Sequence, residues 1–211
     1  TTDVDGMAGN ADIKFQQDVG GQIFYLSFNQ KDERFKNAHF LNAMRWAVDY
    51  NGMVDTFLKG TEVVHQSFLP KGYLGALEDQ PYTLDIEKAK AELAESGVTD
   101  TKIVLSVRNA SDRMDMAQSI HQATLQSWGP DYPDPNTNSS TFAENPGNAD
   151  EDKNTGYLAW RNAYDPGEMT AMSQAAVLES DSAKRVEMYA ELQKKHRETA
   201  PFIVMFQIGY Q

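Results

Sequence analysis

Segments with the composition of β-strands alternate along this chain with amphipathic helical segments, and this order limits the folds open to it. Residues 22–28 and 202–207 are rich in aliphatic and aromatic side chains, which is typical of strands. Between them, apolar residues recur at helical spacing in residues 37–48, 85–97 and 182–199. Strands that alternate with helices predict an α/β or α+β fold.

The charge and composition of the chain exclude several classes of function. Its formal net charge of −12 repels phosphate backbones, so we expect no nucleic-acid partner. No run of about 18 apolar residues occurs, so we expect no membrane insertion. The absence of cysteine excludes disulfides, thiol nucleophiles and cysteine-based zinc sites. Residues 1–6 lack the features of a signal peptide, so a secreted protein would carry its signal on a longer precursor.

No motif for catalysis or metal binding occurs, and we expect no catalytic residue, metal or cofactor. The sequence holds four histidines without metal-ligand spacing, at positions 39, 65, 121 and 196. Residues 134–145 and 150–161 begin like calcium loops but lack the glycine and glutamate needed at the sixth and twelfth places. The pair Asp131 and Asp134 is a weak basis for a hydrolase, because no other catalytic group accompanies it.

The most distinctive segment is Trp128–Pro135, with the sequence WGPDYPDP. Proline fixes its own φ and restricts the residue before it, so this backbone is stiff and directs its side chains. A ligand with an ammonium group and an apolar body would meet a carboxylate at Asp131 and flat apolar rings at Trp128 and Tyr132. The same composition is equally typical of a surface turn whose aspartates cap their own backbone.

The segments around this turn are less regular. A helical pattern from about Arg113 to Leu125 runs into the turn without a visible C-cap. Residues 61–82 lack periodicity, and residues 130–156 are dense in Pro, Asn, Asp, Ser and Gly, so we expect loops in both segments. Both are long for plain connections, so we expect residues 61–82 to pack against another part of the chain.

Five blocks of the sequence, in the right order, resemble the family-5 extracellular solute-binding proteins of the oligopeptide- and dipeptide-binding type. The blocks are FYLSFNQ, LNAMRWAVDYNGMVDTFLKG, DIEKAKAELAESG, WGPDYPDP and SAKRVEMYAELQKKHRETAPFIVMF. The resemblance implies an α/β fold, a single lobe of the type II periplasmic-binding-protein fold, with a mixed sheet flanked by helices. Residues 1–211 would form the second, C-terminal ligand-binding lobe, with the first lobe absent.

The resemblance also implies a ligand site. In the family, the carboxylate of the turn lies in the cleft and can hold a ligand's α-ammonium, a role that falls to Asp131 here. The neighbouring Trp128, Gly129 and Tyr132 belong to the same site, and the strand block adds Asn29.

One departure from the family lies just before the turn. The family has a strand, a helix and another strand ahead of the tryptophan, where this chain has only Gln126 and Ser127. We therefore expect an internal segment to be missing between Gln126 and Trp128.

The resemblance implies the periplasmic solute-binding component of an ABC importer. Two lobes would close over a peptide or similar small solute, and the permease would recognise the closed form. Its partners would be the ligand, the missing first lobe and the permease. The alternative is a protein–protein interaction or scaffold domain anchored by Trp128, Tyr132 and Trp160.

Overall fold

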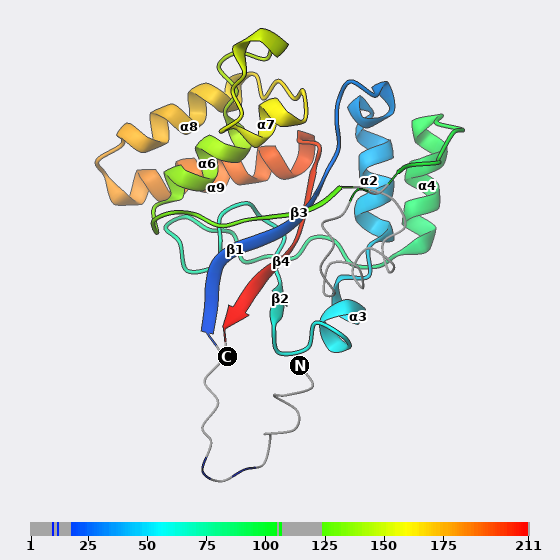
Figure 1. Cartoon of the computed structure of the whole chain (residues 1–211), viewed down its shortest axis with the longest axis horizontal. Helices are drawn as coiled ribbons and strands as arrows, with labels where there is room; N and C mark the ends of the chain where they lie inside the picture. The colour runs from blue at the N-terminus through cyan, green and yellow to red at the C-terminus, as the bar shows by residue number, and fades with distance from the viewer. Residues whose placement is uncertain (1–9, 11, 13–17, 105, 107–123, 211) are drawn as a thin grey trace.

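A four-stranded sheet organises the described part of the chain, which comprises residues 10, 12, 18–104, 106 and 124–210 of a computed structural model (Figure 1). The strands lie in the order β2-β4-β1-β3. They are β1 (Asp18–Ser27), β2 (Glu62–Val64), β3 (Thr124–Trp128) and β4 (Phe202–Tyr210). Each pairing among these strands is antiparallel, whereas the family resemblance implies a mixed sheet.

Helices cover both faces of the sheet, as expected for an α/β lobe (Figure 1). One face carries α2 (Ala38–Ala47), α3 (Tyr50–Asp55) and α4 (Ile86–Ser96), preceded by the 3₁₀ turn η1 (Glu33–Lys36). The other face carries α6 (Pro135–Ala143), α7 (Leu158–Arg161), α8 (Glu168–Leu178) and α9 (Ser182–Thr199), with the 3₁₀ turn η2 (Asp150–Asp152) between α6 and α7.

The alternation of side chains along β1 divides the core in two. Phe24 and Leu26 pack under α2 and α3, while Ile23 and Tyr25 pack under α6 to α9. Successive residues of a strand point to opposite faces, so a continuous apolar run fits a strand that is covered on both sides.

The predicted helices begin and end where their capping residues lie. The Asp85 side chain accepts a hydrogen bond from the Lys88 backbone N–H at the start of α4, and Gly97 ends this helix in the left-handed region with φ 65°. The Asp181 side chain caps α9 in the same way, accepting from two backbone N–H groups. These local signals explain why the ranges predicted from the sequence match the observed ones.

Three sequence expectations need correction. Residues 61–82 contain the short strand β2, and residues 130–156 contain α6, so neither segment is wholly a loop. Thr124 and Leu125 belong to strand β3 rather than to a helix, and the rest of the predicted helix, residues 113–123, lies outside the described residues.

The irregular segment after β2 is held by side-chain amides from other parts of the chain. Gln193 of α9 accepts from Ser67 Oγ and donates to the Gly75 carbonyl, with donor–acceptor distances of 2.6 Å in both cases. Gln207 of β4 accepts from the Lys71 N–H and donates to the Gly20 carbonyl, both at 2.8 Å. The expectation that this segment packs against another part of the chain is confirmed.

Candidate functional site

Strand β3 positions the Trp128–Pro135 turn at its C-terminal end. Trp128 pairs with Ile23 in the sheet, and its half-buried ring meets the buried ring of Phe142 edge-on, with centroids 5.9 Å apart. Gly21 lies against the turn: a Cβ there would fall 2.9 Å from Pro130 Cγ and 2.8 Å from the Tyr73 hydroxyl. Glycine is therefore what allows β1, Tyr73 and the turn to approach this closely.

Two of the side chains expected to touch a ligand, those of Asp131 and Tyr132, are exposed to solvent beyond this base. Tyr132 is 51% exposed. Asp131 is exposed, and its carboxylate has no hydrogen-bond or ion-pair partner among the described residues. The turn thus brings Trp128, Gly129, Asp131 and Tyr132 together and leaves the carboxylate free to accept hydrogen bonds.

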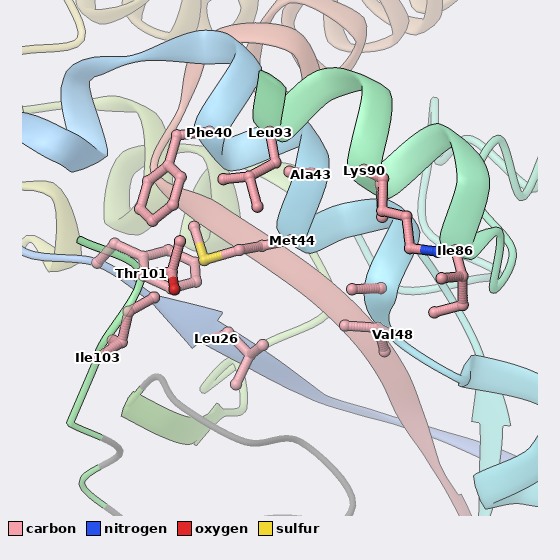
Figure 2. Close-up of a pocket in the computed structure, with 13 residues that line it drawn as sticks. Leu26, Phe40, Ala43, Met44, Val48, Ile86, Lys90, Leu93, Thr101 and Ile103 are labelled. Atoms are coloured by element: carbon pink, nitrogen blue, oxygen red, sulfur yellow. The ribbon is translucent and has the colours of Figure 1, made fainter. Parts of the chain in front are cut away.

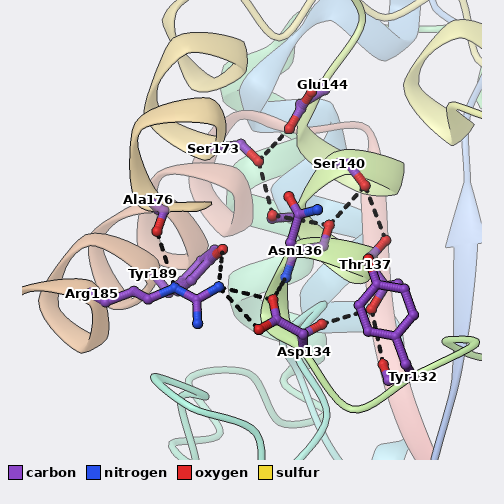
Figure 3. A network of polar contacts seen from close by, with 11 residues as sticks. Tyr132, Asp134, Asn136, Thr137, Ser140, Glu144, Ser173, Ala176, Arg185 and Tyr189 are labelled. Atoms are coloured by element: carbon purple, nitrogen blue, oxygen red, sulfur yellow. Dashed lines mark hydrogen bonds and ion pairs between the residues drawn. The ribbon is translucent and has the colours of Figure 1, made fainter. Parts of the chain in front are cut away.

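Asp134 has a different role, because it fixes the far end of the turn (Figure 3). Its carboxylate caps α6 by accepting from the Asn136 N–H at 2.8 Å. It also accepts from Arg185 Nη2 at 2.9 and 3.1 Å. Partial burial acts to raise the pKa of Asp134, but the hydrogen bonds from Arg185 and the Asn136 backbone hold it below its usual value.

Arg185 connects three helices through this contact. It lies in α9, its Nη2 reaches the cap of α6, and its Nε donates to the Ala176 carbonyl of α8 at 3.1 Å (Figure 3). Its guanidinium also lies 5.3 Å from the centroid of the Tyr189 ring. A planar guanidinium that is bound on several sides has little freedom, so the start of α6 is firmly placed.

Asn29 is not brought to the turn. Trp128 pairs with Ile23, and Asn29 follows the opposite end of β1, where Ser27 pairs with Thr124. A strand rises about 3.3 Å per residue, so Ile23 and Ser27 alone are separated by roughly 13 Å. The Asn29 side chain accepts from the Lys31 N–H at 2.9 Å and shapes a local turn.

Trp160, named as a possible interface anchor, is engaged within the chain. Its indole N–H donates to the Ala149 carbonyl at 2.9 Å. This contact holds the segment around η2 against α7 and gives the ring a structural role.

A separate apolar cavity of about 380 Å³ lies between α2, α4 and β1 (Figure 2). Its lining includes Leu26 of β1, Phe40 and Met44 of α2, and Ile86 and Leu93 of α4. The apolar spacing of α4 predicts that Ile86 is buried, but this residue is 48% exposed. The cavity offers apolar contact and holds few polar groups that could orient a ligand.

The described residues contain no group of three or more metal-binding side chains. Among the described helices, none combines the length and the apolar character required to cross a bilayer.

Residues 1–124 match the family described as bacterial extracellular solute-binding proteins, family 5 Middle. The chain belongs to this family. The match covers more than half of the chain, and the sheet with helices on both faces agrees with it.

Two curated relatives extend the similarity over most of the chain. A probable D,D-dipeptide-binding periplasmic protein of Escherichia coli is 23% identical over 221 residues, covering 90% of this chain and 42% of that protein. The dipeptide-binding protein of the same organism is 24% identical over 239 residues, covering 96% and 43%. The chain thus spans less than half the length of these relatives.

Solved structures show the same fold. The ABC transporter-associated periplasmic binding protein DppA from Helicobacter pylori, in complex with the peptide STSA, aligns with a TM-score of 0.77 at 16% identity. The alignment covers 99% of this chain and 46% of that protein. The fold is therefore that of one lobe of a periplasmic binding protein, as the family-5 resemblance predicts.

Proposed function

We propose that this chain is the second, C-terminal lobe of a periplasmic solute-binding protein that captures peptides or similar small solutes for an ABC importer. The observation that supports this most is the Trp128–Pro135 turn, which is rigid at its base and carries an unpaired carboxylate at Asp131. The mechanism is capture by two closing lobes, without chemistry.

The chemistry of the turn fits a ligand with a free amine. Asp131 accepts hydrogen bonds from an ammonium group, while Tyr132 and the half-buried Trp128 contact the apolar body beside it. An exposed pair of this kind contributes about 0–1 kcal/mol. Disrupting a desolvated interfacial pair costs roughly 2–5 kcal/mol. Closure by a first lobe therefore increases the contribution of the Asp131–ammonium pair to the free energy of binding.

The relatives support peptides as the ligand class. One is named for D,D-dipeptides, another for dipeptides, and a third holds the peptide STSA. These ligands share an α-ammonium group. One carboxylate that accepts hydrogen bonds from this group can therefore bind each of them. A permease and a first lobe are the partners that this function requires.

The shortened junction before Trp128 belongs to the same proposal. Both alignments extend over more positions than the 211 residues of the chain, so the relatives carry residues without a counterpart here. We place the missing segment between Gln126 and Trp128. Strand β3 pairs with β1 at both Gln126 and Ser127, so the sheet accommodates the shortened junction.

The test is a thermal-shift screen of the intact two-lobed protein against dipeptides, oligopeptides, opines, sugars and metal chelates. A ligand in excess over its Kd raises the unfolding midpoint by mass action. We expect peptides with a free amine to raise it, and Asp131→Ala to lose most of that shift. Asp55→Ala, which removes an exposed carboxylate at the end of α3, serves as the control and keeps the shift.

Two results would contradict parts of the proposal. If sugars or chelates stabilise the parent and Asp131→Ala equally, Asp131 is only a turn residue. If no solute shifts the midpoint and the chain forms a stable dimer, the scaffold function replaces solute capture.

A further inference from the structure

Tyr73 lies between two tight turns in the sequence PKGYLGA. Its N–H donates to the Pro70 carbonyl at 3.1 Å, and its carbonyl accepts from the Ala76 N–H at 3.0 Å. The third residue of each turn is a glycine with positive φ, 87° at Gly72 and 76° at Gly75. This is the geometry of a type II turn, which favours glycine at that place. The backbone of Tyr73 is therefore fixed on both sides.

Side chains from two distant elements hold these turns in place. Gln207 of β4 accepts from the Lys71 N–H at 2.8 Å, and Gln193 of α9 donates to the Gly75 carbonyl at 2.6 Å. Both glutamines are almost completely buried, so neither can easily move away. Tyr73 thus has the rigid support that a binding residue requires.

The Tyr73 hydroxyl lies beside the Trp128–Pro135 turn. A Cβ added to Gly21 would lie 2.8 Å from the hydroxyl oxygen and 2.9 Å from Pro130 Cγ, so both atoms approach the same point of β1. Asp131, which carries the free carboxylate of the candidate site, directly follows Pro130. Tyr73 is therefore a neighbour of the candidate site, although a distant part of the sequence supplies it.

This hydroxyl is an available hydrogen-bond donor. It has no hydrogen-bond partner within the part of the chain that the structure describes. Tyr73 is half-buried, and burial raises the pKa of its hydroxyl, so the group stays protonated and can donate. Closure of a first lobe would remove water from the hydroxyl, and a buried tyrosine hydroxyl usually finds an acceptor.

A peptide offers a matching acceptor. When Asp131 holds the α-ammonium group of a peptide, the first carbonyl oxygens of that peptide lie only a few bonds away. A carbonyl oxygen accepts hydrogen bonds and cannot donate them, so it complements a hydroxyl donor and not a second carboxylate.

We propose that Tyr73 is a further ligand-binding residue, whose hydroxyl donates a hydrogen bond to a carbonyl oxygen of the peptide that Asp131 holds by its ammonium group. This inference rests on the function proposed above. The competing role is structural, with the ring packed against β1 and Pro130 and the hydroxyl left to water.

The test measures the Kd of the intact two-lobed protein for dialanine, trialanine and the peptide STSA by calorimetry. Tyr73→Phe keeps the ring and removes only the hydroxyl. We expect this variant to bind about 5- to 10-fold more weakly, as for the loss of one hydrogen bond, and to keep the unfolding midpoint of the ligand-free protein. Tyr82→Phe is the control, because Tyr82 is also half-buried but packs on the other face of the sheet, and it should keep the Kd of the parent.

The outcomes separate this inference from the proposed function. If Tyr73→Phe binds like the parent while Asp131→Ala binds weakly, the role of Tyr73 is overturned and the proposed function stands. If the weaker binding comes with a lower midpoint of the ligand-free protein, or occurs equally in Tyr82→Phe, the role of Tyr73 is overturned as well. If the parent binds none of these peptides, peptide capture and the role of Tyr73 are overturned together.

Discussion

Two buried histidines make the stability of the chain dependent on pH. Burial lowers the pKa of His65 to about 4 and that of His196 to about 3. The unfolded chain binds protons at these positions near pH 6.5, whereas the folded chain does not. The stabilisation that comes from burying these two neutral rings is therefore complete above about pH 6.5, and it is lost as the pH falls from there toward the folded-state pKa values. We expect a loss of about 3 kcal/mol in the free energy of unfolding between about pH 6.5 and pH 5, measured in urea.

The contribution of one ring can be isolated. His196 is stacked on Phe202 and lies edge-on to Phe68, so His196→Phe keeps the aromatic packing. This variant should lose about half of the pH dependence. His39→Gln removes an exposed histidine and should retain it. An unchanged slope in His196→Phe would show that other groups cause the effect.

For single residues, the sequence predicted which side chains are exposed better than it predicted which side chains contact each other. Asp131 and Tyr132 were predicted as a presented pair, and the structure exposes both. Nothing in the sequence linked Asp134 to Arg185, since 51 positions separate them and charged residues are common on helix surfaces. Asn29 was assigned by resemblance alone, and its register in β1 places it away from the turn.

Among the helices and strands, α6 depends strongly on a single residue, Asp134, in a way that its sequence does not reveal. Asp134→Ala removes the N-cap of α6 and leaves Arg185 without its carboxylate partner. We expect a loss of about 2–3 kcal/mol in unfolding free energy, from the cap together with the unpaired guanidinium. Asp181→Ala removes only a cap, that of α9, and should cost about 1 kcal/mol. Equal losses in the two variants would show that the ion pair contributes nothing.

The contact between β1 and the turn can be tested through Gly21. Gly21→Ala places a methyl group 2.9 Å from Pro130 Cγ, so the turn or the strand must shift. Overpacking of this kind typically costs about 1–3 kcal/mol. Gly156→Ala is the matched control, because no atom lies within 4 Å of its added Cβ.

We expect thermal unfolding to show a lower midpoint for Gly21→Ala only, and the NMR signal of the Trp128 indole to move with it. If Gly21→Ala unfolds like the parent and the indole signal does not move, the close approach at Gly21 is absent in solution.

Helices with their own capping signals were predictable, and elements that depend on distant residues were not. Helices α4 and α9 have an aspartate cap and clear periodicity. Helix α6 has the sequence PNTNSSTFA, which is rich in residues of low helix propensity. It forms because Asp134 caps it and because Asn138, Ser139 and Phe142 are buried. Strands β2 and β3 are short and depend on pairing with β4 and β1.

For the whole molecule, we expect this chain alone to bind peptide weakly or not at all. Asp131 is exposed to water, and in the function that we propose it is a first lobe that desolvates this carboxylate. Calorimetry of the 211-residue chain with a peptide that stabilises the two-lobed protein should give no Kd tighter than about 1 mM, near the −4 kcal/mol expected of a few exposed contacts. A micromolar Kd would contradict this expectation.

The fold as a whole was predictable because it depends on the order of elements. Five blocks in sequence order pointed to the lobe, although each block alone was weak evidence. The antiparallel pairing of the described sheet was not predictable in this way. Strand direction is decided by which strands meet, and composition does not carry that information.

The amide contacts around residues 65–77 have a consequence for proteolysis. This segment has little regular secondary structure, yet Gln193 and Gln207 hold its backbone at Gly75 and Lys71. A protease must draw several residues of backbone into its active site, so a segment held at these points is a poor substrate. Trypsin should therefore cleave at exposed lysines elsewhere, such as Lys153, long before it cleaves at Lys71. Irregular backbone in this lobe is thus no guide to where the chain is vulnerable.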